Sequence, residues 1–65
     1  MMGYHQAMDL YLRECEKSER KPRRPNGTLS VKVGPVWRLN CPAGCVAEVD
    51  ERTGQVRTFD PPRPA

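Results

Sequence analysis

The chain has 65 residues, 11 basic and 8 acidic side chains, and a formal net charge of +3. A chain this short forms one small domain at most, and a catalytic cleft shielded from water is hard to build from it, so we expect a non-enzymatic protein. No apolar run approaches the roughly 18 residues that cross a bilayer. The first residues lack the basic-then-apolar pattern of a signal peptide, so the expected location is the cytoplasm.

Residues 3–19 are predicted to form an amphipathic helix. Proline cannot continue a helix, so the helix should end before Pro22. The apolar stripe of an amphipathic helix must be buried against a second layer of structure. Apolar side chains recur with helical spacing at Tyr4, Met8, Tyr11, Leu12 and Cys15.

Residues 20–27 form a basic, proline-rich linker. Its prolines favour extended geometry, and Asn26-Gly27 marks a turn. The basic strip of this linker comprises Arg20, Lys21, Arg23 and Arg24, and its charge exceeds the net charge of the whole chain. One interpretation is a strip that contacts nucleic-acid phosphates or steers an acidic partner; the other is a solvated linker without a binding role.

Residues 28–59 predict a β-meander because the apolar period changes from helical to two. Leu29, Val31 and Val33 alternate with polar residues in the first strand and are expected to lie in the core, and Gly34-Pro35 breaks this strand. Further strands are expected at 37–41, 45–49 and 55–59. A glycine-containing loop at 51–54 would place Val49 opposite Val56 and Glu48 opposite Arg57. Residues 60–65 are predicted to be a flexible, proline-rich tail.

The expected fold class is therefore α+β, as a single domain over 1–65. The N-terminal helix packs on one face of a three- or four-stranded antiparallel meander. The opposite face mixes apolar and charged side chains, which is more typical of protein contact than of nucleic-acid binding. The residues expected to bind a partner on that outer face are Val36, Arg38, Val46, Arg57 and Phe59.

The chain contains three cysteines. The segment Cys41-Pro42-Ala43-Gly44-Cys45 predicts a three-residue hairpin loop with a glycine bulge, which would place Cys41 opposite Cys45. A zinc site is the alternative, and its candidate ligands are Cys15, Cys41 and Cys45 with His5. However, His5 and Cys15 would lie about 15 Å apart along a helix, so both cannot reach one ion. We therefore expect a structural turn, reduced thiols and no cofactor, with a disulfide between Cys41 and Cys45 as the remaining alternative.

These features lead us to expect a small regulator or inhibitor that acts by protein–protein contact. The abundance of arginine over lysine, together with the prolines, points to a GC-rich genome and so to a bacterial or phage source, and regulators of this kind are carried by phages and mobile elements. The first alternative is a nucleic-acid-binding accessory protein that uses the basic strip. The second is a small structural zinc-binding protein. The sequence leaves self-association open.

Overall fold

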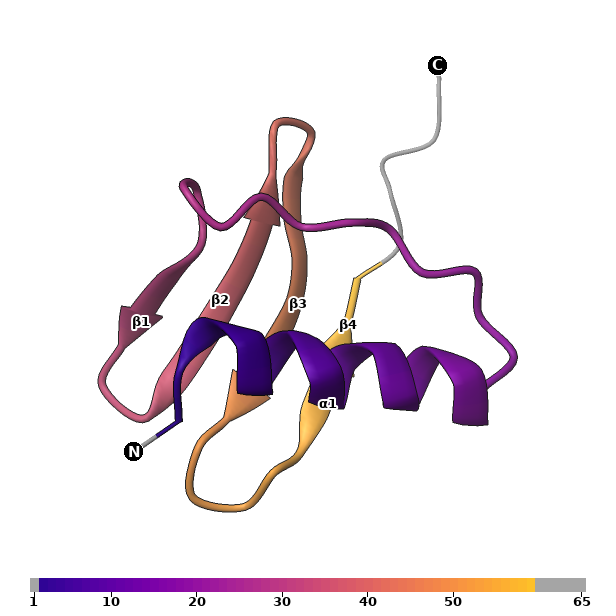
Figure 1. Cartoon of the computed structure of the whole chain (residues 1–65), viewed down its shortest axis with the longest axis horizontal. Coiled ribbons are helices and arrows are strands. Elements are labelled where there is room, and N and C mark those ends of the chain that lie inside the picture. The colour runs from indigo at the N-terminus through magenta and orange to yellow at the C-terminus, as the bar shows by residue number, and fades with distance from the viewer. Residues whose placement is uncertain (1, 60–65) are drawn as a thin grey trace.

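The computed structural model describes residues 2–59, so the predicted tail at 60–65 lies outside the described part. One helix is followed by four strands that pair in the order β1-β2-β3-β4, each antiparallel to its neighbour. The helix lies across one face of the sheet (Figure 1). This confirms the α+β class, with four strands. The elements are α1 (Tyr4–Lys17), β1 (Val31–Val33), β2 (Val36–Cys41), β3 (Gly44–Asp50) and β4 (Val56–Thr58).

Both ends of α1 have an identifiable cap. At the start, the Gly3 amide donates to Oε1 of Gln6 at 2.9 Å. At the end, the Arg20 amide donates to the Cys15 carbonyl at 2.7 Å, and the Glu19 amide donates to the Glu16 carbonyl at 3.2 Å. This is the Schellman arrangement, which needs a left-handed residue, and Glu19 supplies it with a φ of 56°. The helix therefore ends at Lys17, two residues before the predicted boundary at 19.

The core lies between α1 and the inner face of the sheet, which is the face turned toward the helix. The Trp37 ring borders this core, donates from Nε1 to the Met2 carbonyl at 2.9 Å and meets the Tyr4 ring edge-on. These contacts fix the N-terminal half of the helix on β2. The fully or almost fully buried apolar residues are Ala7, Tyr11, Cys15, Leu39, Val46, Ala47 and Val49.

The predicted register of the last hairpin is confirmed. Val49 lies opposite Val56, and Glu48 lies opposite Arg57. The Asp50 amide donates to the Gln55 carbonyl at 2.9 Å and closes the loop, in which Gly54 has a φ of 75°. Pairing apolar with apolar and acid with base was enough to set this register from the sequence.

The first strand faces the opposite way from the prediction. Val31 and Val33 were expected in the core, but they are 47% and 59% exposed. Gly34 and Pro35 form a two-residue turn in which Gly34 has a φ of 60°, and this places Val33 opposite Val36. Because paired residues share a face, Val33 must lie on the outer face with Val36.

Lys32 is consequently the residue of β1 that points to the helix side, opposite Trp37. Its Nζ lies 2.6 Å from Oε2 of Glu51, which compensates the charge at this half-buried position. Leu29, also predicted in the core, is 42% exposed and precedes the start of β1. The helical residue Leu12 is likewise exposed, at 40%.

The second hairpin also differs from the prediction. Cys41 pairs with Gly44 and Asn40 pairs with Cys45, so the loop contains only Pro42 and Ala43. The prediction that Cys41 lies opposite Cys45 is therefore wrong. The shorter loop is compensated by a bulge beside Leu39, where the register shifts by one residue.

The bulge explains why Val46 is fully buried. Val46 is the extra residue on β3, since Leu39 pairs with Ala47 and the next residue of β2 pairs with Cys45. In a bulge of this kind the strict alternation of side chains is interrupted. Val46 and Ala47, although adjacent in sequence, both have 0% exposure and both belong to the core. The expected place of Val46 on the outer face is wrong for this reason.

Candidate functional site

The outer face of the sheet carries two rows of side chains that the strand pairing brings side by side. The first row crosses all four strands and consists of Val31, Arg38, Glu48 and Arg57. The second row crosses the first three strands and consists of Val33, Val36 and Asp50. We call the seven residues of these rows the outer-face cluster.

The cluster is divided into an apolar and a charged half. Val31, Val33 and Val36 occupy the β1 side, and the first two are among the most exposed large apolar residues in 2–59. On the other half, Nε of Arg38 lies 3.5 Å from Oε2 of Glu48, and Arg57 flanks Glu48 from β4. The Arg38 side chain is 50% exposed, so it remains accessible to a second molecule.

Three of the five residues predicted on this face are found there: Val36, Arg38 and Arg57. Val46 is in the core. Phe59 follows the end of β4 and borders a hollow beside Tyr11 and Cys15 on the helix side, so the structure places it with the linker.

Sequence reasoning missed Val31 and Val33 as members of the outer face. The signal that could have found them is the spacing of Val33-Gly34-Pro35-Val36. A two-residue turn with glycine first is a common hairpin connection, and it forces the flanking valines onto one face. A simple strand break at Gly34-Pro35, as predicted, does not place Val33 and Val36 on the same face.

The linker that carries the basic strip is bound to the helix and sheet at several points. The Arg23 amide donates to Oη of Tyr11 at 2.9 Å, and Nη2 of Arg23 donates to the Phe59 carbonyl at 2.6 Å. Oη of Tyr4 donates to the carbonyl of buried Pro25 at 3.1 Å. We call residues 20–26 the strap, because the segment runs from the end of α1 back across the sheet toward β1 (Figure 1).

The strap also changes the interpretation of the basic strip. Arg23 is half-buried and its guanidinium is engaged with Phe59, whereas Lys21 and Arg24 are exposed. Burial raises the pKa of the Tyr11 phenol, although the Arg23 amide partly opposes that shift, so Tyr11 stays neutral and accepts from the strap at neutral pH. The strip lies on the helix side and does not join the outer-face cluster.

The three cysteines are free thiols. Cys15 lies on the buried face of α1, whereas Cys41 and Cys45 are half-buried on neighbouring strands and line one open hollow. Within residues 2–59, no group of three or more His, Cys, Asp or Glu side chains is placed to hold a metal ion. The His5 side chain is exposed, and its ring centroid lies 5.6 Å from that of Tyr4. The four candidate zinc ligands are therefore not brought together.

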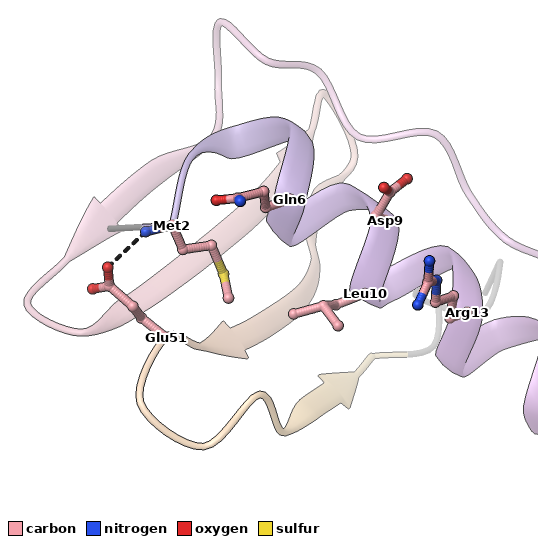
Figure 2. Close-up of a pocket in the computed structure, with 6 residues that line it drawn as sticks. All are labelled: Met2, Gln6, Asp9, Leu10, Arg13 and Glu51. Carbon is pink, nitrogen blue, oxygen red and sulfur yellow. Dashed lines mark hydrogen bonds between the residues drawn. The ribbon is translucent and has the colours of Figure 1, made fainter.

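A shallow hollow of about 460 Å³ lies beside the N-terminal half of α1 (Figure 2). Glu51 is held at two points: it accepts from the Met2 amide at 2.7 Å through Oε1 and pairs with Lys32 through Oε2. The Lys32 ammonium, and then the Met2 amide, lower the pKa of Glu51. Glu51 therefore joins the N-terminal segment to β1 and serves the fold. The hollow is lined by Met2, Gln6, Asp9, Leu10, Arg13 and Glu51.

The chain matches no protein-family model, no curated protein and no solved structure. Its function must therefore be inferred from its own residues. Across the part of the chain that the structure describes, no helix has both the length and the apolar character that crossing a membrane would require.

Proposed function

We propose that this protein is a small, non-enzymatic regulator or inhibitor that acts by binding another protein through the outer-face cluster. The observation that supports the proposal is a sheet face that no helix within residues 2–59 covers, on which Val31 and Val33 are about half exposed beside a row of charges. In a small protein, neighbouring exposed apolar side chains bordered by charged ones are typical of a contact surface.

The charges on this face favour a protein partner over a nucleic acid. Glu48 stands between Arg38 and Arg57 in the first row, and Asp50 ends the second row. Two acids and two bases give the cluster no net charge, whereas phosphate binding requires a surplus of positive charge. A protein surface with alternating charges can match this pattern and gain specificity from it.

Contact is expected through the face of the sheet and not through addition of a strand to the edge at β1. Only three residues form β1, and Lys32 points to the helix side in an ion pair with Glu51. Short edge strands and inward-pointing charges are devices that oppose pairing with another strand. A partner that covered Val31, Val33 and Val36 from the face would leave this ion pair intact.

The proposal places the protein in the cytoplasm, where three free thiols are stable, and among the small regulators that phages and mobile elements carry, which its size fits. Catalysis by a cysteine–histidine pair has no support, since Cys15 is buried and His5 is exposed at the other end of the helix.

The test is a comparison of capture by matched variants from extracts of the source cells. A variant with Val31→Lys and Val33→Lys should lose the specific partner that the natural protein retains, because both added ammonium groups lie inside the proposed interface. His5→Lys is the control, since His5 is also exposed but lies on α1, on the helix side, and lines neither hollow beside the strap. Circular dichroism must show that all three proteins are folded.

Loss of the partner in the Val31/Val33 variant alone would support the proposal. Equal retention by all three folded proteins would refute it. Loss in the His5→Lys variant alone would also refute it, because the partner would then bind the helix side.

A further inference from the structure

The strap forms a ridge between two hollows on the helix side of the molecule. The first hollow, which we call the helix-side hollow, is lined by Met8 and Leu12 of α1 and has a volume of about 400 Å³. The second, which we call the strand-side hollow, reaches Thr58 of β4 and Phe59 and has a volume of about 300 Å³. Pro22 and Arg23 line both hollows, so they form the crest of the ridge. Because the strap is hydrogen-bonded to Tyr11, Tyr4 and Phe59, the fold holds the ridge and its two hollows in place.

Each hollow combines apolar walls with basic side chains. Met8, Leu12 and Pro25 line the helix-side hollow, together with Arg24. Tyr11, Cys15 and Phe59 line the strand-side hollow, together with Lys21. Leu12 and Phe59 are 40% and 37% exposed, which is high for residues of their size.

Among residues 2–59, no acidic side chain lines either hollow, and the lining residues that carry charge are all basic. The shallow hollow beside Glu51 differs, because acids and a base line it together. A ligand for the two strap hollows should therefore carry negative charge close to apolar groups. The four basic residues of the strip would provide long-range attraction for it.

The geometry points to an acidic, extended segment of a partner protein, and we propose that it crosses the strap and places one apolar side chain in each hollow. In an extended peptide, residues i and i+2 project to the same side about 7 Å apart, somewhat more than the spacing of two paired strands. That separation suits side chains on either side of a ridge one chain wide. Acidic neighbours of these anchors would meet Lys21 and Arg24.

This inference concerns a second surface and does not depend on the proposed function. The outer-face cluster and the strap lie on opposite sides of the sheet, since α1 packs on the inner face and the strap is hydrogen-bonded to Tyr11 of α1. Each site can be altered without changing a side chain of the other.

The experiment selects a displayed random-peptide library on the immobilised full-length chain and measures the synthesised peptides by fluorescence anisotropy. The selected peptides should be rich in Asp and Glu and should carry at least two aliphatic or aromatic residues. Two variants remove the site: the double variant Lys21→Glu and Arg24→Glu, and the single variant Leu12→Asp. Their matched controls are Arg52→Glu and Ala43→Asp, at exposed loop positions that line neither strap hollow, and Val33→Asp is added to detect peptides that bind the outer face instead.

The expected result is a loss of affinity of at least about tenfold in both site variants and a change below about twofold in both controls. The affinity should also fall as salt is added, because part of it is electrostatic. Sodium decanoate, a small amphiphilic anion, should compete poorly because it can fill only one hollow.

Several results would overturn the inference. They are an empty selection, peptides without acidic residues, equal binding by site variants and controls, stronger binding of decanoate or of a DNA oligonucleotide than of the peptides, and peptides lost only in Val33→Asp. The last result would still support the outer face as a protein-binding surface, so the two proposals can fail separately.

Discussion

The replacement Val46→Ala should destabilise the protein strongly, whereas Val33→Ala should have little effect. Val46 has 0% exposure and belongs to the core, while Val33 is 59% exposed on the outer face. The alternation of the sequence predicts the reverse. Since both variants remove the same two methyl groups from a strand, their difference isolates burial.

The magnitude follows from the buried surface. Two methyl groups at about 0.8 kcal/mol each, with an added term for the cavity they leave, give a loss of about 2 kcal/mol for Val46→Ala. In a chain of this size, that loss lowers the melting temperature by about 8–16 °C. Val33→Ala should change the free energy of unfolding by no more than about 0.5 kcal/mol, as is usual for surface replacements.

The assay is urea unfolding followed by the fluorescence of Trp37, the single tryptophan of the chain. Trp37 is half-buried against the N-terminal segment, so its emission should report loss of the core. If the two alanine variants unfold at the same urea concentration, or if Val33→Ala is the less stable, the bulge at Val46 is not formed and the assigned faces of β1 and β3 are wrong.

Two further stability predictions follow from single sites. Glu19→Gly should raise the free energy of unfolding by about 0.5–1 kcal/mol, because glycine removes a left-handed strain of about 1–2 kcal/mol and costs up to about 1 kcal/mol in unfolded-chain entropy; a loss of stability in urea would contradict the cap. Glu51→Gln should destabilise the protein at pH 7 but not near pH 3. The pKa of Glu51 is lowered, so its ion pair contributes above the ordinary pKa of glutamate, about 4.3, and that contribution disappears as the pH falls through the lowered value. Urea midpoints at both pH values test this, and a difference that persists unchanged at low pH would exclude the ion pair as its cause.

The helix and the last hairpin could be predicted from the sequence because each depends on local signals. Helical spacing of Tyr4, Tyr11 and Cys15 identified the buried stripe of α1, and all three lie in or against the core. The loop at 51–54 and its flanking pairs fixed the register of β3 and β4. In both cases neighbouring residues agreed on one arrangement.

The faces of β1 and the end of β3 could not be predicted by alternation alone. Alternation gives two sets of residues in each strand but does not say which set faces the helix. For β1, the turn at Gly34-Pro35 decides the question, and Lys32 is accepted on the inner side only because Glu51, far away in sequence, pairs with it. For β3, the bulge depends on how β2 and β3 pair, which no local signal shows.

The candidate site was predicted in part for the same reasons. Val36, Arg38 and Arg57 follow regular alternation and lie on the outer face as predicted. Val46 lies in the core because of the bulge, and Phe59 follows the end of β4 and lies on the helix side. Val31 lies on the outer face because β1 is oriented opposite to the prediction. The fixed course of the strap depends on Tyr11 and Arg23, whose hydrogen bond joins segments that no sequence period connects.

The most direct test of the outer face as a protein-binding surface is a cross-saturation experiment on the valine methyl groups in the complex with the captured partner. Valine methyls occur on both sides of the sheet, at Val31, Val33 and Val36 on the outer face and at Val46 and Val49 in the core. The proposal predicts that saturation of partner protons attenuates the three outer-face valines and leaves Val46 and Val49 nearly unchanged. Attenuation absent from Val31, Val33 and Val36 would contradict the proposal, whatever other residues respond.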